Sequence, residues 1–98
     1  MVLVDRWTYI AKRGHINEAV ALVKTESERY TKPRTYRVLR PNTGSMDTFV
    51  MEIEFESMED RQRFWSEWGA TPEAAAFLEK WHNLTETGVN REIWSLEE

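Results

Sequence analysis

The stretch MDTFVMEIEFE, from Met46 to Glu56, alternates apolar and polar side chains more regularly than any other part of the chain. Its apolar face carries Phe49, Met51, Ile53 and Phe55. Its other face carries Thr48, Val50, Glu52, Glu54 and Glu56. A period of two residues is typical of a β-strand that buries one face. The sequence therefore predicts a strand here, with its acidic face turned away from the core.

A second strand is expected just upstream, from Thr35 to Arg40, because the intervening segment PNTGS (41–45) consists of turn-forming residues. Strand, turn and strand make a β-hairpin. Basic residues are frequent in and before the first of these strands, at Lys32, Arg34, Arg37 and Arg40. Half of them should face the acidic side chains across the hairpin, where opposite charges stabilise paired strands.

Both ends of the chain carry further strand patterns. The segment VLVDRWTYI, from Val2 to Ile10, alternates so that one face holds Leu3, Asp5, Trp7 and Tyr9. The segment from Val89 to Leu96 alternates in the same way. Four strands are therefore predicted in all.

Two helical regions separate these strands. Apolar residues recur at three- and four-residue steps from His15 to Tyr30, which predicts an amphipathic helix that Pro33 ends. The second region begins after Ser57, whose hydroxyl is expected to cap a helix that starts at Met58.

The second helical region is expected to have two halves. Gly69 interrupts it, and Thr71 followed by Pro72 starts it again with a capping residue and a proline in the first turn. Gly88 is a candidate for its C-terminal stop. The second half is predicted to pack through Ala74, Ala75, Leu78, Trp81 and His82.

The order strand, helix, strand, strand, helix, strand predicts an α+β, ferredoxin-like fold (βαββαβ) with both helical regions on one face of a four-stranded antiparallel sheet. The 98 residues suffice for a single domain, spanning 1–98. The uncovered face would mix large apolar groups with Arg and Glu. We expect two copies to pack these faces together as a homodimer, in which Glu52 or Glu54 meets an arginine such as Arg37.

Composition excludes several functional classes. Thirteen Lys and Arg against seventeen Asp and Glu give a net charge of −4, which disfavours a nucleic-acid partner. The absence of Cys excludes disulfides and thiolate chemistry and suits the cytoplasm. No apolar run approaches the roughly 20 residues of a membrane span, so neither a membrane partner nor a leader segment is expected.

Several segments together resemble NIPSNAP-type members of the dimeric α/β-barrel superfamily. These segments are Asp5-Arg6-Trp7-Thr8-Tyr9 with Gly14, the strand from Phe49 to Phe55 running into Ser57-Met58-Glu59, Phe64-Trp65-Ser66-Glu67-Trp68, Thr71-Pro72-Glu73, Phe77-Leu78-Glu79-Lys80-Trp81, and Glu92-Ile93-Trp94. The resemblance implies a dimeric ferredoxin-like domain. It does not select a reaction, because the superfamily also contains cofactor-free monooxygenases, haem-degrading enzymes, isomerases and proteins with no assigned reaction.

Aromatic residues form the main candidate site. Trp65 and Trp68 lie one helical turn apart, and Leu78, Trp81 and His82 follow at three- and four-residue steps. In barrels of the resembled superfamily the pocket lies between such helices and the sheet, where the face carrying Trp7 and Tyr9 would also lie. Two interpretations stay open. The aromatic side chains either fill a small core or line a pocket for a flat hydrophobic ligand.

Metal and hydrolase sites are not supported by the motifs present. Glu79 and His82 have the spacing of half a di-iron site, but one chain supplies only one such motif. His15 and Glu18 are expected at the start of a helix. No Gly-x-Ser-x-Gly motif precedes any serine, and the isolated glycines form no phosphate-binding loop. No metal and no cofactor is predicted.

Three functions remain as hypotheses. The first is a homodimer that binds a flat hydrophobic or aromatic small molecule, with Trp7, Tyr9, Trp65, Trp68, Trp81 and Arg37 as ligand-binding residues. The second is a cofactor-free monooxygenase, or a haem-degrading relative, in which His82 abstracts a proton from an aromatic substrate. The third is a non-enzymatic dimer whose surface binds partner proteins. The sequence leaves open whether the protein is an enzyme.

Overall fold

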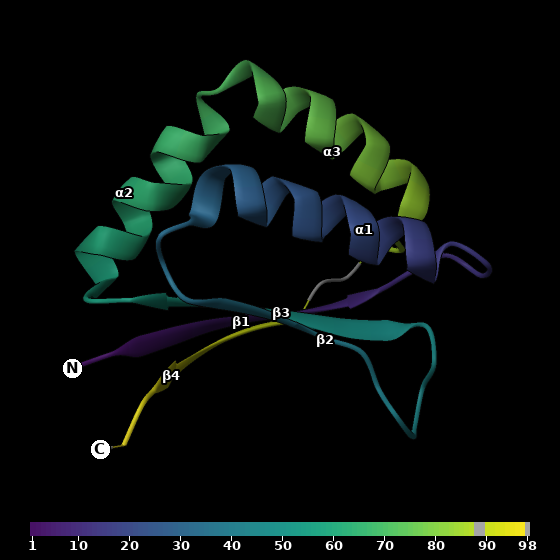
Figure 1. The fold of residues 1–98 in the computed structure, drawn as a ribbon, viewed down its shortest axis with the longest axis horizontal. Helices are drawn as coiled ribbons and strands as arrows, with labels where there is room; N and C mark the ends of the chain where they lie inside the picture. Colours follow the sequence, from purple (N-terminus) through teal and green to yellow (C-terminus); the bar gives the residue numbers. More distant parts are fainter. Residues whose placement is uncertain (88–89, 98) are drawn as a thin grey trace.

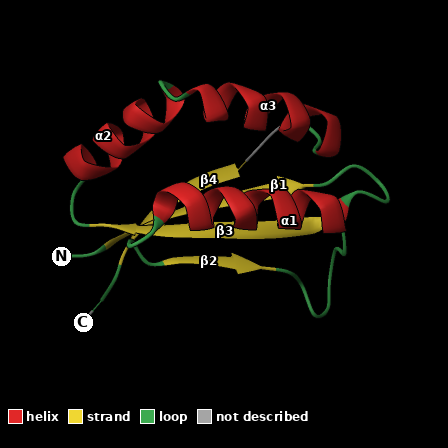
Figure 2. Ribbon diagram, turned by 45° about the horizontal axis from the view of Figure 1, so that its top comes forward, coloured by secondary structure: helices red, strands yellow, loops and turns green. Residues whose placement is uncertain are grey.

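The computed structural model describes residues 1–87 and 90–97, in which three α-helices and one π-helical turn lie on one face of a four-stranded antiparallel sheet (Figures 1 and 2). The strand order is β2-β3-β1-β4. In chain order the elements are β1 (Leu3–Ile10), α1 (Ile16–Glu26), η1 (Ser27–Thr31), β2 (Tyr36–Leu39), β3 (Thr48–Phe55), α2 (Met58–Gly69), α3 (Pro72–Leu84) and β4 (Asn90–Ser95). The predicted ferredoxin-like α+β fold is confirmed.

The register of the sheet separates a helix face from an open face. In the central pair, Tyr9 lies opposite Phe49 and Leu3 opposite Phe55, so both apolar faces turn towards the helices. Phe49, Ile53 and Phe55 are at most 2% exposed. Burial of each such side chain contributes about 1.5–3 kcal/mol to folding, which fixes the register, because a one-residue slip would expose the whole set.

Hydroxyl caps start both helices of the second region, as predicted. Ser57 Oγ accepts a hydrogen bond from the N–H of Asp60, and Thr71 Oγ1 accepts one from the N–H of Ala74. The Asp60 carboxylate reaches back to the N–H of Glu56 at 3.2 Å. These bonds satisfy N–H groups that the first helical turn leaves without intrahelical partners.

The first helical region differs from the prediction in its hydrogen bonding. It is α-helical as far as Glu26, and η1 then continues it as a π-helix. The N–H of Lys32 donates to the carbonyl of Ser27 at 3.3 Å, five residues back. The sequence did not reveal this change because apolar periodicity follows the buried face and not the spacing of backbone bonds.

The buried face of α3 is rotated from the predicted one. Ala74 and Trp81 are buried and Phe77 packs against the core, whereas Ala75, Leu78 and His82 are exposed. The cause is geometric: Ala74, Phe77 and Trp81 follow at three- and four-residue steps and form a stripe that brings the two largest rings onto the sheet. The predicted stop at Gly88 and the start of the last strand at Val89 lie outside the described residues.

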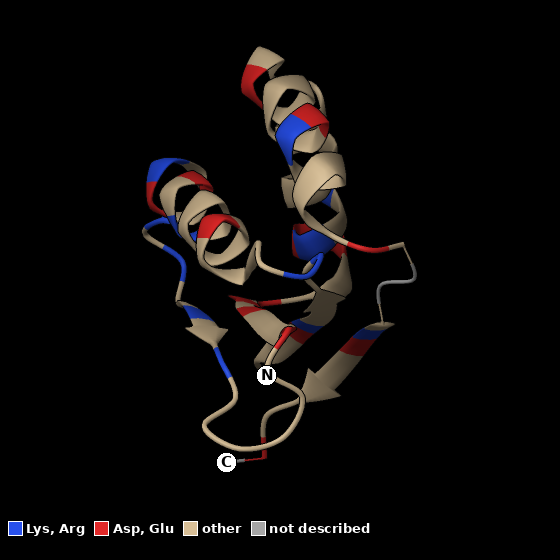
Figure 3. Ribbon diagram, turned by 90° about the vertical axis from the view of Figure 1, so that its right-hand side faces the viewer, with Lys and Arg blue, Asp and Glu red and all other residues tan. Residues whose placement is uncertain are grey.

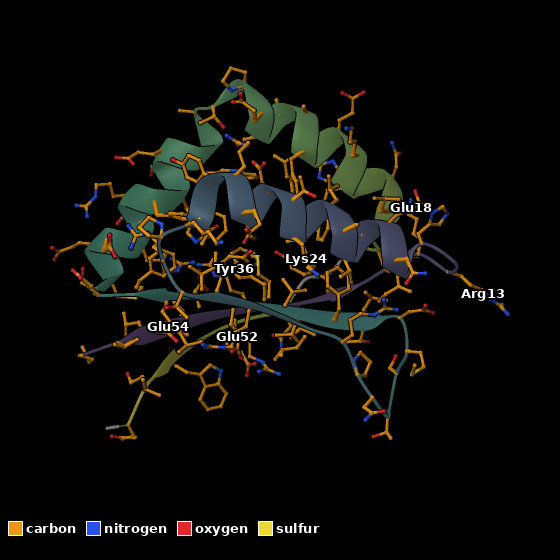
Figure 4. The ribbon with its side chains drawn as sticks, viewed as in Figure 1. Arg13, Glu18, Lys24, Tyr36, Glu52 and Glu54 are labelled. Atoms are coloured by element: carbon orange, nitrogen blue, oxygen red, sulfur yellow. The ribbon has the colours of Figure 1, made fainter. Side chains whose placement is uncertain are left out.

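The open face of the sheet carries a row of ion pairs. Glu52 lies between Arg6 (2.7 Å) and Arg37 (2.9 Å), and Arg37 also contacts Glu54 at 2.8 Å. Glu52 and Glu54 lie on the side of the sheet opposite Tyr36 (Figure 4). The predicted attraction across the hairpin is confirmed for Arg37 alone, because Lys32 pairs with Glu28, Arg34 with Asp60, and Arg40 donates to Asn17. The structure thus makes within one chain the Arg37 pairing that was expected between two copies.

Candidate functional site

A cavity of about 500 Å³ lies between the helices and the sheet. Its lining comes from β1, β3, α1, η1, α2, α3 and the segment after α3. The residues are Trp7, Tyr9, Val23, Glu26, Ser27, Tyr30, Thr31, Met51, Ile53, Phe64, Trp65, Trp68, Phe77, Leu78, Trp81, His82, Thr85, Glu86 and Thr87. A volume of 300–1,000 Å³ is typical of small-molecule sites.

Six aromatic rings form a closed circuit of contacts in this lining. Trp7 contacts Trp65 (centroids 5.6 Å apart), Trp65 contacts Trp68 (5.8 Å), and Trp68 contacts Phe77 (5.5 Å). The circuit continues from Phe77 to Trp81 (5.1 Å), from Trp81 to Tyr9 (4.9 Å), and from Tyr9 back to Trp7 (6.2 Å). Each contact lies within the favourable range for aromatic pairs.

Local structure explains how separate segments form the circuit. Trp7 and Tyr9 are two residues apart on β1 and so share its helix face. Trp65 and Trp68 are three apart on α2, and Phe77 and Trp81 are four apart on α3, so each pair occupies one helix face. Viewed along the sheet, α1 lies on the β2 side, and α2 and α3 lie on the β4 side (Figure 3). This arrangement brings the aromatic side chains of α2 and α3 over β1.

A buried carboxylate lies beside the circuit. Asp5 is fully buried, and its Oδ2 accepts hydrogen bonds from Arg61 Nε at 2.8 Å and from Trp65 Nε1 at 2.9 Å. Two buried atoms have no partner among the described residues: Asp5 Oδ1 and the indole nitrogen of Trp7. The sequence predicts that Asp5 shares a face of its strand with Leu3, Trp7 and Tyr9, and it suggests no role for the carboxylate. The signal that could have revealed one is a carboxylate between apolar residues, which needs a buried partner.

Burial changes the acidity of Tyr9, which is a lining residue and 8% exposed. Desolvation raises the pKa of its hydroxyl far above the ordinary value, the charge of Asp5 raises it further, and the charge of Arg91 opposes both. The phenol therefore stays neutral and keeps its proton throughout the physiological range.

Glu26 is a lining residue that the sequence analysis did not single out. Its carboxylate accepts hydrogen bonds from Arg29 at 2.7 and 2.9 Å and from Trp68 Nε1 at 2.6 Å. The hydrogen bond from Arg29 is the main cause that lowers the pKa of Glu26. The carboxylate is thus ionised, and it ties the end of α1 to α2 beside the cavity.

The structure brings six of the seven predicted site residues together. Trp7, Tyr9, Trp65, Trp68, Trp81 and His82 all line the cavity. His82 is exposed at its rim, and its ring makes no hydrogen bond to any described residue. Arg37 is the exception, because it lies on the open face of the sheet in ion pairs with Glu52 and Glu54 and does not line the cavity.

The described residues contain neither a metal-binding cluster nor a membrane-spanning helix. No group of three or more His, Asp or Glu side chains in residues 1–87 and 90–97 could hold a metal ion. Within the same ranges, no helix has the length and apolar character needed to cross a membrane.

Comparison with known proteins identifies the fold. No protein-family model and no curated protein matches the sequence. In structure, the chain is similar to an uncharacterized NIPSNAP domain protein from Burkholderia xenovorans, with a TM-score of 0.83, 18% identity, and coverage of 97% of this chain and 94% of that one. It is also similar to a NIPSNAP family protein with unknown function from Agrobacterium tumefaciens, with a TM-score of 0.80, 22% identity, and coverage of 95% and 86%.

A more distant likeness is to SnoaB, a cofactor-independent oxygenase from Streptomyces nogalater. The TM-score is 0.74 at 10% identity, over 99% of this chain and 94% of that one. Identities this low establish common architecture and leave activity open. The chain has the ferredoxin-like fold shared by these NIPSNAP family proteins, as its sequence resemblance implied.

Proposed function

We propose that this protein binds a flat, hydrophobic aromatic small molecule in the cavity between its helices and its sheet. The observation that carries the proposal is the closed circuit of six aromatic rings lining a space of about 500 Å³. Protein cores are packed as densely as organic crystals, with few voids larger than a water molecule. An open volume of this size among large rings therefore favours a pocket over a simple core.

The lining also supplies the few polar groups that orient a ligand. The Tyr9 hydroxyl is a neutral donor, and His82 and Glu86 stand at exposed positions on the lining. An apolar site with a small number of polar groups is typical of small-molecule pockets. A three-ring ligand with no specific polar contact should bind with a dissociation constant on the order of 10 µM.

Tryptophan fluorescence tests this function. Titration with 9-anthracenemethanol should quench the emission of the wild-type protein with saturation at micromolar concentrations. Trp68→Leu should weaken binding about tenfold, because it removes one ring of the circuit. Trp94→Leu is the matched control, since Trp94 is 55% exposed and pairs with Val4 on the open face. Absence of saturable quenching in the wild type would refute the function.

An oxygenase is the second candidate, because the imidazole of His82 lines the cavity and has no described side chain competing for it. In this reaction His82 removes a proton from the bound substrate, and the resulting carbanion reduces O2 and forms a C–O bond to a peroxide, which takes the proton back from His82. Loss of the remaining C–H proton with cleavage of the O–O bond then gives the carbonyl product and one water molecule. Oxygen uptake with anthrone as substrate tests the idea. His82→Ala should abolish enzyme-dependent uptake and leave ligand affinity within about twofold; no uptake by the wild type would exclude this candidate.

Homodimerisation through the open sheet face is the third part of the proposal. Ile10, Leu39, Trp94 and Leu96 are 43–55% exposed, and the first three lie on strands of this sheet beside the Arg6–Glu52–Arg37 row. Packing against a second copy would remove these apolar side chains from water. A surface that binds other proteins would be the alternative use of the same face, and a stable monomer with a saturable protein partner would support it.

A further inference from the structure

An arginine that forms no ion pair with any described carboxylate stands beside the aromatic circuit. Arg91 is the cross-strand neighbour of Trp7 in the β1–β4 pair. Its guanidinium carbon lies 4.9 Å from the centre of the Trp7 ring. Of the ion pairs formed by the described residues, none includes Arg91. Stacking on the indole fixes one side of the guanidinium and leaves its N–H donors available.

Trp7 and Tyr9, the two lining residues on which Arg91 acts, are also donors. The charge of Arg91 acts on the hydroxyl of Tyr9, which stays protonated because of its burial. The indole N–H of Trp7 is a third donor, buried and without a described partner, and an oxygen atom of a ligand in the cavity would be one way to satisfy it. Trp7 and Tyr9 both line the cavity, and Arg91 adjoins it through Trp7.

The charge of Asp5 reaches this corner, because at the Tyr9 hydroxyl it raises the pKa more than the charge of Arg91 lowers it. Arg61 partly compensates Asp5 at 2.8 Å, and Arg29 pairs with Glu26 at 2.7 Å. Glu86 has no ion pair among the described residues, but it is exposed, where water and salt screen its charge. Arg91 is exposed as well, so water and salt screen its attraction for an anionic ligand. The gain in ligand affinity that it provides is therefore moderate.

We propose that the natural ligand of the cavity is an aromatic acid, whose rings lie in the circuit and whose carboxylate or phenolate oxygen accepts hydrogen bonds from Arg91 and Tyr9. This inference rests on the proposed ligand-binding function and adds the chemical class of the ligand. A guanidinium recognises an anionic oxygen through charge-assisted hydrogen bonds, which are about twice as strong as neutral ones. The aromatic circuit and the aliphatic lining residues would hold the ring system.

Three probes with the same ring system test the proposal: 9-anthracenecarboxylate, 9-anthracenemethanol and 9-(aminomethyl)anthracene. Calorimetric titration of the wild-type protein should show the carboxylate binding about tenfold more tightly than the alcohol, and the ammonium compound more weakly than the alcohol. Arg91→Gln should remove the advantage of the carboxylate and leave the affinity for the alcohol within about twofold. Tyr9→Phe should reduce the advantage by a smaller factor.

Arg13→Gln is the matched control, because Arg13 is exposed in the turn before α1 and points away from the cavity (Figure 4). It removes the same charge and should leave all three affinities unchanged. Equal binding of the alcohol and the carboxylate, or a preference for the carboxylate that survives Arg91→Gln, would overturn the proposal while the ligand-binding function stands. Failure of all three probes to bind would overturn both.

Discussion

The indole nitrogen of Trp65 donates a hydrogen bond of 2.9 Å to the carboxylate of Asp5, across 60 residues of sequence. Asp5 lies in the central strand β1 and Trp65 in α2, so this bond fixes the height and rotation of α2 over the sheet. Arg61, one turn earlier on the same helix, binds the same oxygen. The carboxylate thereby positions one side of the aromatic circuit.

Removal of this carboxylate should cost the fold much of its stability. Asp5→Leu leaves the guanidinium of Arg61 buried and unpaired, and we expect a loss of about 3–5 kcal/mol in the free energy of unfolding measured with urea. The double variant Asp5→Leu, Arg61→Leu should recover more than half of that loss, because neither charge remains. Glu79→Gln, a change at an exposed position of α3, is the control. A single variant that loses less than about 1 kcal/mol would contradict this role.

The Asp60 carboxylate should make stability sensitive to acid. Two hydrogen bonds of 2.7 Å from Arg34 hold the pKa of Asp60 below its usual range. Because the folded-state pKa is depressed, the stabilisation is present above the unfolded-state value of about 4 and is lost as the pH falls through the folded-state value. Asp60→Asn should therefore be less stable than the wild type at pH 7, by a difference that shrinks as the pH falls from about 4 to about 2. A constant difference between these pH values would contradict the assignment.

The hydroxyl of Tyr9 should make the free energy of unfolding decrease at alkaline pH. Its folded-state pKa is raised, so the unfolded chain releases the phenolic proton first, and stability falls as the pH rises above about 10. The slope from this one group is about 1.4 kcal/mol per pH unit. Tyr9→Phe has no such proton and should lose stability less steeply between pH values of about 10 and 12. Urea unfolding curves of both proteins at several pH values measure these slopes. Equal slopes for the wild type and Tyr9→Phe would contradict the prediction.

Assembly through the open face should depend on Trp94. Trp94→Glu places a charge among the apolar groups of the proposed interface, and we expect the dimer dissociation constant to rise at least about tenfold in sedimentation experiments. Met58→Glu is the control, because Met58 is similarly exposed at the start of α2, away from this face. A wild-type protein that is monomeric at micromolar concentration would contradict the dimer itself.

The sequence predicted the fold well because its signals are local and repeated. The alternation over Phe49 to Phe55 determined which face of β3 is buried, and the hydroxyls of Ser57 and Thr71 located both helix starts. The ferredoxin-like arrangement, with both helical regions on one face, followed from the sequence of elements and the handedness of crossovers. Each of these inferences needs only neighbouring residues.

The parts that escaped prediction depend on contacts between distant segments. The partnership of Asp5 with Arg61 and Trp65 spans 56 and 60 positions, and no local pattern encodes it. Arg37 was assigned to the site as well as to a pair with Glu52 or Glu54, because the sequence does not show which face of the sheet carries it. Only the register of three strands shows that Glu52 and Glu54 already occupy it.

Indole N–H resonances give the most direct measurement of the ligand-binding cavity, because four tryptophans line it and the fifth does not. In a nitrogen-15 correlation spectrum of the labelled protein, saturating 9-anthracenemethanol should shift the signals of Trp7, Trp65, Trp68 and Trp81 through the ring current of the ligand. The signal of Trp94, on the open face, should stay in place. Four unmoved cavity signals, or a shift confined to Trp94, would contradict the account.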